Sequence, residues 1–175
     1  MKLATSHLED YVQEMYESIN IIKPEQLNME TIASGLGVSL ILEETNSRCM
    51  DTYGDCFIFI DSRLSEQQQF EEFCHELCHA MWHMGTQRNM PLPYMLYQEW
   101  KAEGFMLQAA VPSFMLEPVI SKADYKHEAV ALISKTFGIT EDTAFKRLNQ
   151  HLSKVQEHEL NEQFQFKMKR IYRYL

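Results

Sequence analysis

Long apolar runs are missing from this 175-residue chain. Its longest apolar segments span a handful of residues, whereas a helix that crosses a bilayer needs about 20. We therefore expect no membrane span. The first residues also lack the apolar stretch of a secretory signal peptide, so we expect a cytoplasmic protein whose four cysteines are reduced thiols.

Positive charge is also scarce. The chain has 16 lysines and arginines against 25 aspartates and glutamates, a net charge of -9. Because nucleic-acid phosphates attract basic surfaces, this balance argues against general affinity for nucleic acid and favours cationic or polar protein partners. Repeats and low-complexity tracts are absent too, while 45% hydrophobic residues suffice for the core of one ordinary domain.

The first 64 residues contain patterns for two helices and a small sheet. Ser6 and Glu9 have the spacing of a capping box and predict a helix as far as Asn20; a second helix is expected after Asn28, ending at the glycines of 35–37. Three strand-like segments follow, separated by turn-forming residues, and the economical interpretation is an antiparallel meander. These segments are 38–44, 48–53 and 56–61.

Beyond residue 64 the patterns are helical. A capping box at Ser65 starts a helix that can run to about Met84, and the prolines of "MPLPY" predict a loop at 90–94. Further helices are expected at about 95–110, 122–137, 140–151 and 153 to the end. The predicted fold class is α+β, with a first domain at 1–115 and a helical lobe at 116–175.

The segment "HELCH" is the strongest chemical motif. His75 and His79 are four residues apart, so on a helix they lie one turn apart on one face, where two imidazoles can bind one zinc ion. Steps of about 100° per residue put them opposite the apolar side that contains Phe73 and Leu77. The histidines therefore favour a metal site over core packing.

A zinc site that catalyses needs a third protein ligand. His83 lies one more turn along the same helix, about 6 Å further up its axis, so we expect it to line the cleft rather than bind the ion. Glu99 lies 20 residues after His79 on the next predicted helix, with Glu103 one turn beyond it. Glu103 could accept a hydrogen bond from a ligand histidine, and if Glu103 is the ligand the two roles exchange.

Other residues near the motif have predicted roles in catalysis or packing. Glu76 follows the first histidine and can act as the general base for the attacking water. Tyr94 and Tyr97 are candidates for stabilising an oxyanion, although ordinary packing is the simpler interpretation for each. Cys74 and Cys78 are rotated about 100° from the ligand positions, so we expect buried packing thiols.

The segment 133–151 has the pattern of a helix-turn-helix. Its second helix begins with Glu141 and Asp142, which would face phosphates with the wrong sign, and it offers only Lys146 and Arg147 as contacts. We therefore expect a lobe that shapes the cleft or docks a protein, with direct DNA binding disfavoured.

Taken together, these motifs resemble the ImmA/IrrE-type metallopeptidases of bacteria and their mobile elements, from about residue 20 to 150. The resemblance rests on "CFIFID" at 56–61, on "HELCH" followed by His83, and on "EWKAEGFMLQAAVP". The last segment is similar to the family signature E-x-x-A-N-x-F-A-A-x-L-L-M-P and departs from it mainly in the small and apolar positions. Residues in register are Glu99, Ala102, Phe105 and Pro112, whereas Glu103 replaces the usual asparagine.

The resemblance implies a zincin-like fold and a gluzincin-like site with one Zn2+ per chain on His75, His79 and Glu99. It further implies an anti-repressor that cleaves a helix-turn-helix repressor encoded nearby and relieves repression of phage, mobile-element or stress genes. The strand at 56–61 is expected to be the edge strand that aligns an extended substrate. Two alternatives remain: a DNA-binding regulator with a structural metal, and a non-catalytic protein that inactivates a repressor by association.

Overall fold

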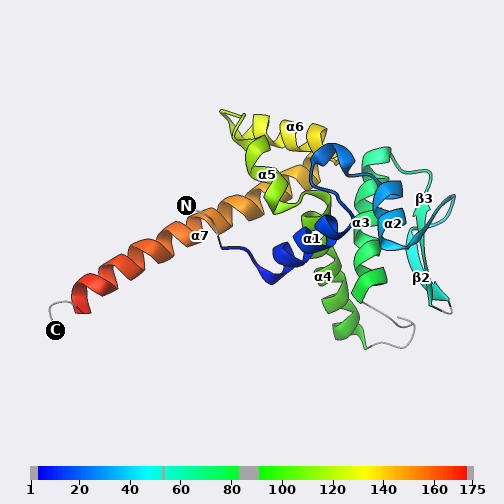
Figure 1. Cartoon of the computed structure of the whole chain (residues 1–175), viewed down its shortest axis with the longest axis horizontal. Helices are drawn as coiled ribbons and strands as arrows, with labels where there is room; N and C mark the ends of the chain where they lie inside the picture. The colour runs from blue at the N-terminus through cyan, green and yellow to red at the C-terminus, as the bar shows by residue number, and fades with distance from the viewer. Residues whose placement is uncertain (1–3, 53, 83–90, 173–175) are drawn as a thin grey trace.

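The computed structural model describes residues 4–52, 54–82 and 91–172, with side chains as far as residue 164. Helices dominate, and one small sheet lies at the side of the molecule (Figure 1). Within the described ranges, none of the helices is long and apolar enough to cross a membrane. In chain order the elements are α1 (His7–Ser18), the short 3-10 helix η1 (Pro24–Gln26), α2 (Met29–Leu36), β1 (Ser39–Glu43), β2 (Arg48–Thr52), β3 (Asp55–Asp61), α3 (Glu66–Trp82), α4 (Leu92–Ala110), α5 (Ser113–Ile120), α6 (Lys126–Phe137) and α7 (Glu141–Tyr172).

The α+β class is confirmed, but the predicted antiparallel meander is wrong. The strand order is β1-β3-β2; β3 pairs with β2 antiparallel and with β1 parallel. Ile58 of β3 therefore lies between Leu40 of β1 and Cys49 of β2. β3 takes the centre because Ile58 and Ile60 are completely buried, and a central strand has both backbone edges paired.

This strand order also corrects the expected substrate edge. The segment 56–61 forms most of the central strand β3, so its backbone is already paired on both sides. The edges of the sheet are β1 and β2, and β2 is the edge that contacts α3. An extended peptide could therefore add to β2 but not to β3.

Capping residues define several helices as predicted. Ser6 and Glu9 form the reciprocal capping box of α1, and Ser65 exchanges the same pair of hydrogen bonds with Gln68 at the start of α3. Asn28 caps α2, which ends at Gly37 with a φ of 71°, a left-handed conformation that favours glycine. The local signals for where these helices begin were therefore read correctly.

Two prolines lie inside helices, contrary to prediction. The loop predicted at 90–94 is wrong from Leu92 onward, where α4 begins, and residue 90 lies outside the described residues. Pro93 is tolerated because it occupies the first turn, where a missing N–H costs nothing. Helix α5 was not predicted, and Pro118 lies inside it. Burial of Met115, Leu116 and Val119 stabilises α5 despite the proline.

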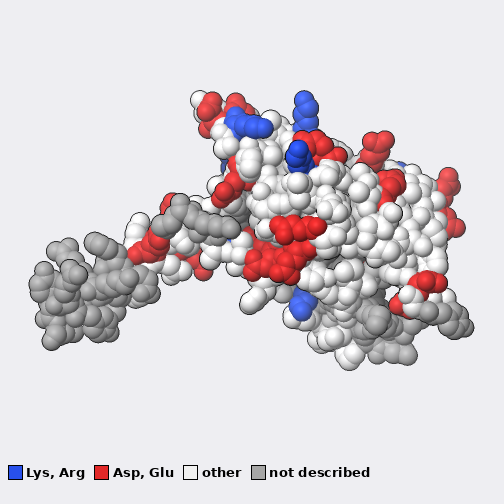
Figure 2. Space-filling model, in the orientation of Figure 1, with Lys and Arg blue, Asp and Glu red and all other residues white. Residues whose placement is uncertain are grey.

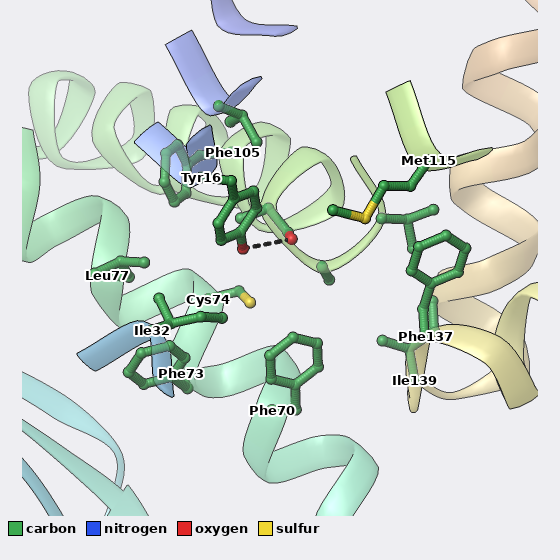
Figure 3. Close-up of a cluster of buried hydrophobic side chains, with 14 of the residues drawn as sticks. Tyr16, Ile32, Phe70, Phe73, Cys74, Leu77, Phe105, Met115, Phe137 and Ile139 are labelled. Carbon is green, nitrogen blue, oxygen red and sulfur yellow. Dashed lines mark hydrogen bonds between the residues drawn. The ribbon is translucent and has the colours of Figure 1, made fainter. Parts of the chain in front are cut away.

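The core joins the sheet to the helices. α3 contacts β3 and β2 and also α4. Phe73 and Leu77 of α3 are fully buried, and Tyr16 of α1 donates a hydrogen bond of 2.7 Å to the carbonyl of Ala109 (Figure 3). Phe137 of α6 belongs to the same cluster, so segments on both sides of the predicted boundary at residue 115 share one core.

Helix α7 is one continuous helix, so the predicted break near residue 152 is wrong. No glycine or proline lies within 141–172 to interrupt it. One face of its first turns is buried, with Ala144 and Leu148 at most 2% exposed. Further along, Leu160 and Phe164 are more than half exposed. Figure 1 shows this later part projecting away from the other helices.

Arg147 of α7 points into the protein. Its side chain is 1% exposed and donates hydrogen bonds to the Val111 carbonyl, to Gln108 and to Ser113 at 3.0, 3.0 and 2.7 Å. A buried guanidinium cannot reach a DNA phosphate. The neighbouring Lys146 forms ion pairs with Asp142 and Glu103, so the pair of cations offered by the helix-turn-helix pattern is engaged within the protein.

Acidic side chains outnumber basic ones on the surface seen in Figure 2, where a block of them lies over α1. This matches the net charge of -9. Such a surface would repel the phosphate backbone of nucleic acid.

Candidate metal centre

Two packed helices bring the predicted ligands together. α3 presents His75 and His79 from successive turns, and α4 returns alongside α3 (Figure 1) and presents Glu99. In this arrangement one nitrogen of each histidine and one carboxylate oxygen of Glu99 all lie within 4.8 Å of one another. The side chains converge although 20 residues separate His79 from Glu99.

The distances between the donor atoms suit a single small ion. The two Nε2 atoms are 3.2 Å apart, His75 Nε2 is 3.3 Å from Glu99 Oε2, and His79 Nε2 is 3.6 Å from Glu99 Oε1. Ligands about 2.0–2.1 Å from a tetrahedral zinc ion are about 3.3–3.4 Å from each other. Two imidazole nitrogens and one carboxylate therefore fit a divalent ion such as zinc.

Burial differs across the three side chains. His79 is 6% exposed and His75 is 26% exposed, whereas Glu99 is 43% exposed. The site thus has a buried floor and an open side. An open side is what a catalytic metal site needs, because water and substrate must reach the remaining coordination position.

Glu76 lies half-buried beside the first histidine. Burial raises the pKa of its carboxyl to about 6, although the charge of His75 and a hydrogen bond from the backbone N–H of Cys49 both act to lower it. The carboxylate therefore lies close to the backbone of the edge strand β2. A carboxylate at this place with a pKa near neutrality has the properties of a general base.

The structure places Glu103 and Tyr97 away from the three ligand side chains. Glu103 lies 3.8 Å from Lys146, so its carboxylate pairs with α7. Tyr97 is about 200° around α4 from Glu99 and stacks on Trp100 with ring centres 6.2 Å apart. Tyr94 is 52% exposed. Tyr97 therefore lies on the far side of α4 from Glu99, the oxyanion role of Tyr94 stays a prediction, and His83 lies outside the described residues.

The predicted packing role of Cys74 and Cys78 is confirmed, since both are fully buried. Sequence reasoning missed the backbone N–H of Cys49 as a partner of Glu76. It could not have been found by motif, because a backbone donor has no residue signature. It also missed the approach of the start of α7 to His75, which depends on tertiary packing.

A half-open site with two histidines and one glutamate on adjacent helices is typical of a metallopeptidase. The model of the IrrE N-terminal-like domain, which defines the M78 peptidase family, matches residues 24–149. The chain belongs to this metallopeptidase family.

Two relatives come from Bacillus subtilis (strain 168). The chain is 32% identical over 158 residues to the uncharacterized protein YqaB, covering 90% of this chain and 91% of YqaB. It is 33% identical over 144 residues to the phage-like element PBSX protein XkdA, covering 82% of this chain and 72% of XkdA. One of the two relatives thus carries the name of a phage-like element.

Proposed function

We propose that the protein is a zinc-dependent endopeptidase whose substrate is a helix-turn-helix repressor, so that cleavage relieves repression of phage or mobile-element genes. The observation that carries the enzymatic part is the convergence of His75, His79 and Glu99 in a member of a metallopeptidase family. The choice of substrate is supported by the family resemblance and by the name of XkdA.

Each residue of the site has a distinct role in this proposal. A divalent ion, when bound, supplies Lewis acidity that polarises a carbonyl and acidifies water. His75, His79 and Glu99 would hold this ion. The Glu76 carboxylate takes the proton from the attacking water and passes it to the nitrogen of the departing amine. The nearby backbone N–H of Cys49 favours the ionised form of that carboxylate.

In this proposal an extended substrate lies along β2. This strand lies at the edge of the sheet that contacts α3, and its residue Cys49 already reaches Glu76. A peptide added to β2 would therefore pass beside the general base. We assign substrate alignment to β2, in place of the strand at 56–61 that the sequence favoured.

Three substitutions separate the roles. Purified protein with zinc would be incubated with a purified helix-turn-helix repressor encoded beside its gene, and products would be followed by intact mass. Glu76→Gln should reduce cleavage at least about 100-fold while keeping bound zinc, because only the base is lost. Glu99→Gln should lose zinc itself, and Glu103→Gln, whose carboxylate pairs with Lys146, should keep both zinc and activity.

The same variants test the alternatives. If Glu76→Gln relieves repression in cells and leaves the repressor intact, the protein acts by association and the peptidase proposal is wrong. If Glu103→Gln loses zinc while Glu99→Gln retains it, the ligand assignment is wrong. A gel-shift experiment with the operator would detect direct DNA binding, which we do not expect from the buried Arg147.

A further inference from the structure

A cavity of about 380 Å³ opens beside the metal centre, and the ligand His75 is part of its wall. Three elements build the rest of the wall. α3 contributes Gln68, Glu71 and Glu72, α4 contributes Met106, and the start of α7 with the residue before it contributes Thr140, Asp142, Thr143 and Lys146. Because it shares His75 with the candidate centre, a side chain in this cavity would belong to a residue close to the cleaved bond.

The wall of the cavity has an excess of negative charge. Three carboxylates, those of Glu71, Glu72 and Asp142, face one ammonium group, that of Lys146. Lys146 is itself paired, at 3.1 Å from Asp142 and 3.8 Å from Glu103. Its charge is therefore compensated within the protein, and a cation entering the cavity meets the remaining carboxylates.

The carboxylates differ in what they already bind. One oxygen of Glu71 accepts the backbone N–H of Thr140 at 2.7 Å, which joins α3 to the start of α7. Glu72 is half-buried and lies one turn before His75 on α3. Glu72 is thus the carboxylate best placed to meet a cation near the metal centre.

We propose that this cavity binds the side chain of an arginine or lysine of the protein substrate, next to the bond that is cleaved. The inference rests on the proposed peptidase function. A long basic side chain matches the wall, because its methylene groups can pack on Met106 while its charged end reaches Glu72 and Glu71. An acidic side chain would be repelled, and an apolar one would bury carboxylates without compensating them.

Binding can be measured without cleavage. The probe is Nα-acetyl-arginine N-methylamide, titrated into the isotope-labelled full chain and followed by NMR, with the neutral isostere Nα-acetyl-citrulline N-methylamide as its control. Arginine should shift the amide signals of Thr140 and Thr143 and bind at least about fivefold more tightly than citrulline. Equal binding of the two probes, or shifts that lie elsewhere, would overturn the proposal.

Two variants and a matched control extend the test. Glu72→Gln should weaken arginine binding about fivefold, whereas Glu66→Gln, an exposed glutamate in the first turn of the same helix, should leave it unchanged. Lys146→Met should strengthen it two- to threefold, because it removes the one cation of the wall. Circular dichroism would confirm that each variant folds. Similar losses in Glu72→Gln and Glu66→Gln would count against the cavity.

Cleavage of a peptide mixture then separates this inference from the proposed function. With zinc present, arginine or lysine should be enriched at one fixed position beside the cleaved bond, and Glu72→Gln should remove that enrichment while cleavage of peptides neutral at that position continues. Cleavage without such enrichment would overturn the cavity assignment but would not contradict the proposed peptidase function. Specific arginine binding without cleavage of any peptide would overturn the peptidase and leave a cation-binding cavity.

Discussion

Replacing Arg147 by methionine should destabilise the protein far more than the same replacement of its neighbour Lys146. Arg147 is 1% exposed and donates to the Val111 carbonyl, Gln108 and Ser113, whereas the Lys146 side chain is 48% exposed. Methionine retains most of the apolar stem at both positions. The two substitutions therefore compare a buried cation with a surface cation on the same helix.

The expected losses differ several-fold. Methionine at 147 removes hydrogen bonds to two buried groups, the Val111 carbonyl and Gln108, and to the half-buried Ser113. Each such loss costs about 1 kcal/mol or more, so we expect about 3 kcal/mol in total. That is a large part of the 5–15 kcal/mol typical of a folded domain. At 146 only surface ion pairs are lost, which contribute at most about 1 kcal/mol.

Urea unfolding followed by circular dichroism measures both losses. For a chain of this size, about 3 kcal/mol should lower the unfolding midpoint by roughly 1–2 M urea, while Lys146→Met should shift it by no more than a few tenths. Equal midpoints for the two variants would refute the reasoning. So would a loss below about 1 kcal/mol for Arg147→Met, because the buried hydrogen bonds would then contribute little to holding α7.

Three further predictions concern acid stability, a core hydrogen bond and thiol reactivity. Burial acts to raise the pKa of Glu9, but hydrogen bonds from Lys154, Ser113 and Ser6 outweigh it and lower the pKa from 4.5 to about 2. The stabilisation from this lowered pKa, up to about 3 kcal/mol, is fully present above pH 4.5 and is lost as the pH falls toward 2, so Glu9→Gln should flatten the acid side of a plot of unfolding free energy against pH. Tyr16→Phe removes the buried bond to Ala109 and should cost about 1–2 kcal/mol in urea unfolding, with unchanged helix content as the control. Burial raises the pKa of the Cys78 thiol to about 12 and that of the Cys74 thiol still further. Ellman's reagent should therefore modify neither thiol in the native protein, whereas all four thiols should react in the denatured protein. Rapid labelling of Cys74 or Cys78 in the native state would contradict their burial.

The candidate site was largely predictable because its geometry is local. Four-residue spacing on one helix places His75 and His79 together, and a single return of the chain brings Glu99 beside them. The caps of α1, α2 and α3 were predictable for the same reason, since a cap depends on residues three positions apart. Patterns of this kind need no knowledge of the rest of the fold.

Features that depend on distant contacts were not predictable. The turn residues between the strands do not predict the order of the strands in the sheet. Here β3 is central, and its Ile58 and Ile60 side chains are completely buried. Arg147 follows a lysine in the sequence, and this pattern does not indicate that its side chain is buried against the Val111 carbonyl. Helix α5 forms despite Pro118 because the apolar residues around the proline are buried by other helices.

The change of burial along α7 has a consequence for hydrogen exchange. Backbone amides around Ala144 and Leu148 lie in a packed part of the helix and should open only when the whole protein unfolds, whereas those near Leu160 and Phe164 can open by fraying of the helix alone. A single unbroken helix should therefore show a gradient of protection factors spanning several orders of magnitude. Limited proteolysis would cut first within its outer turns and leave the metal centre intact.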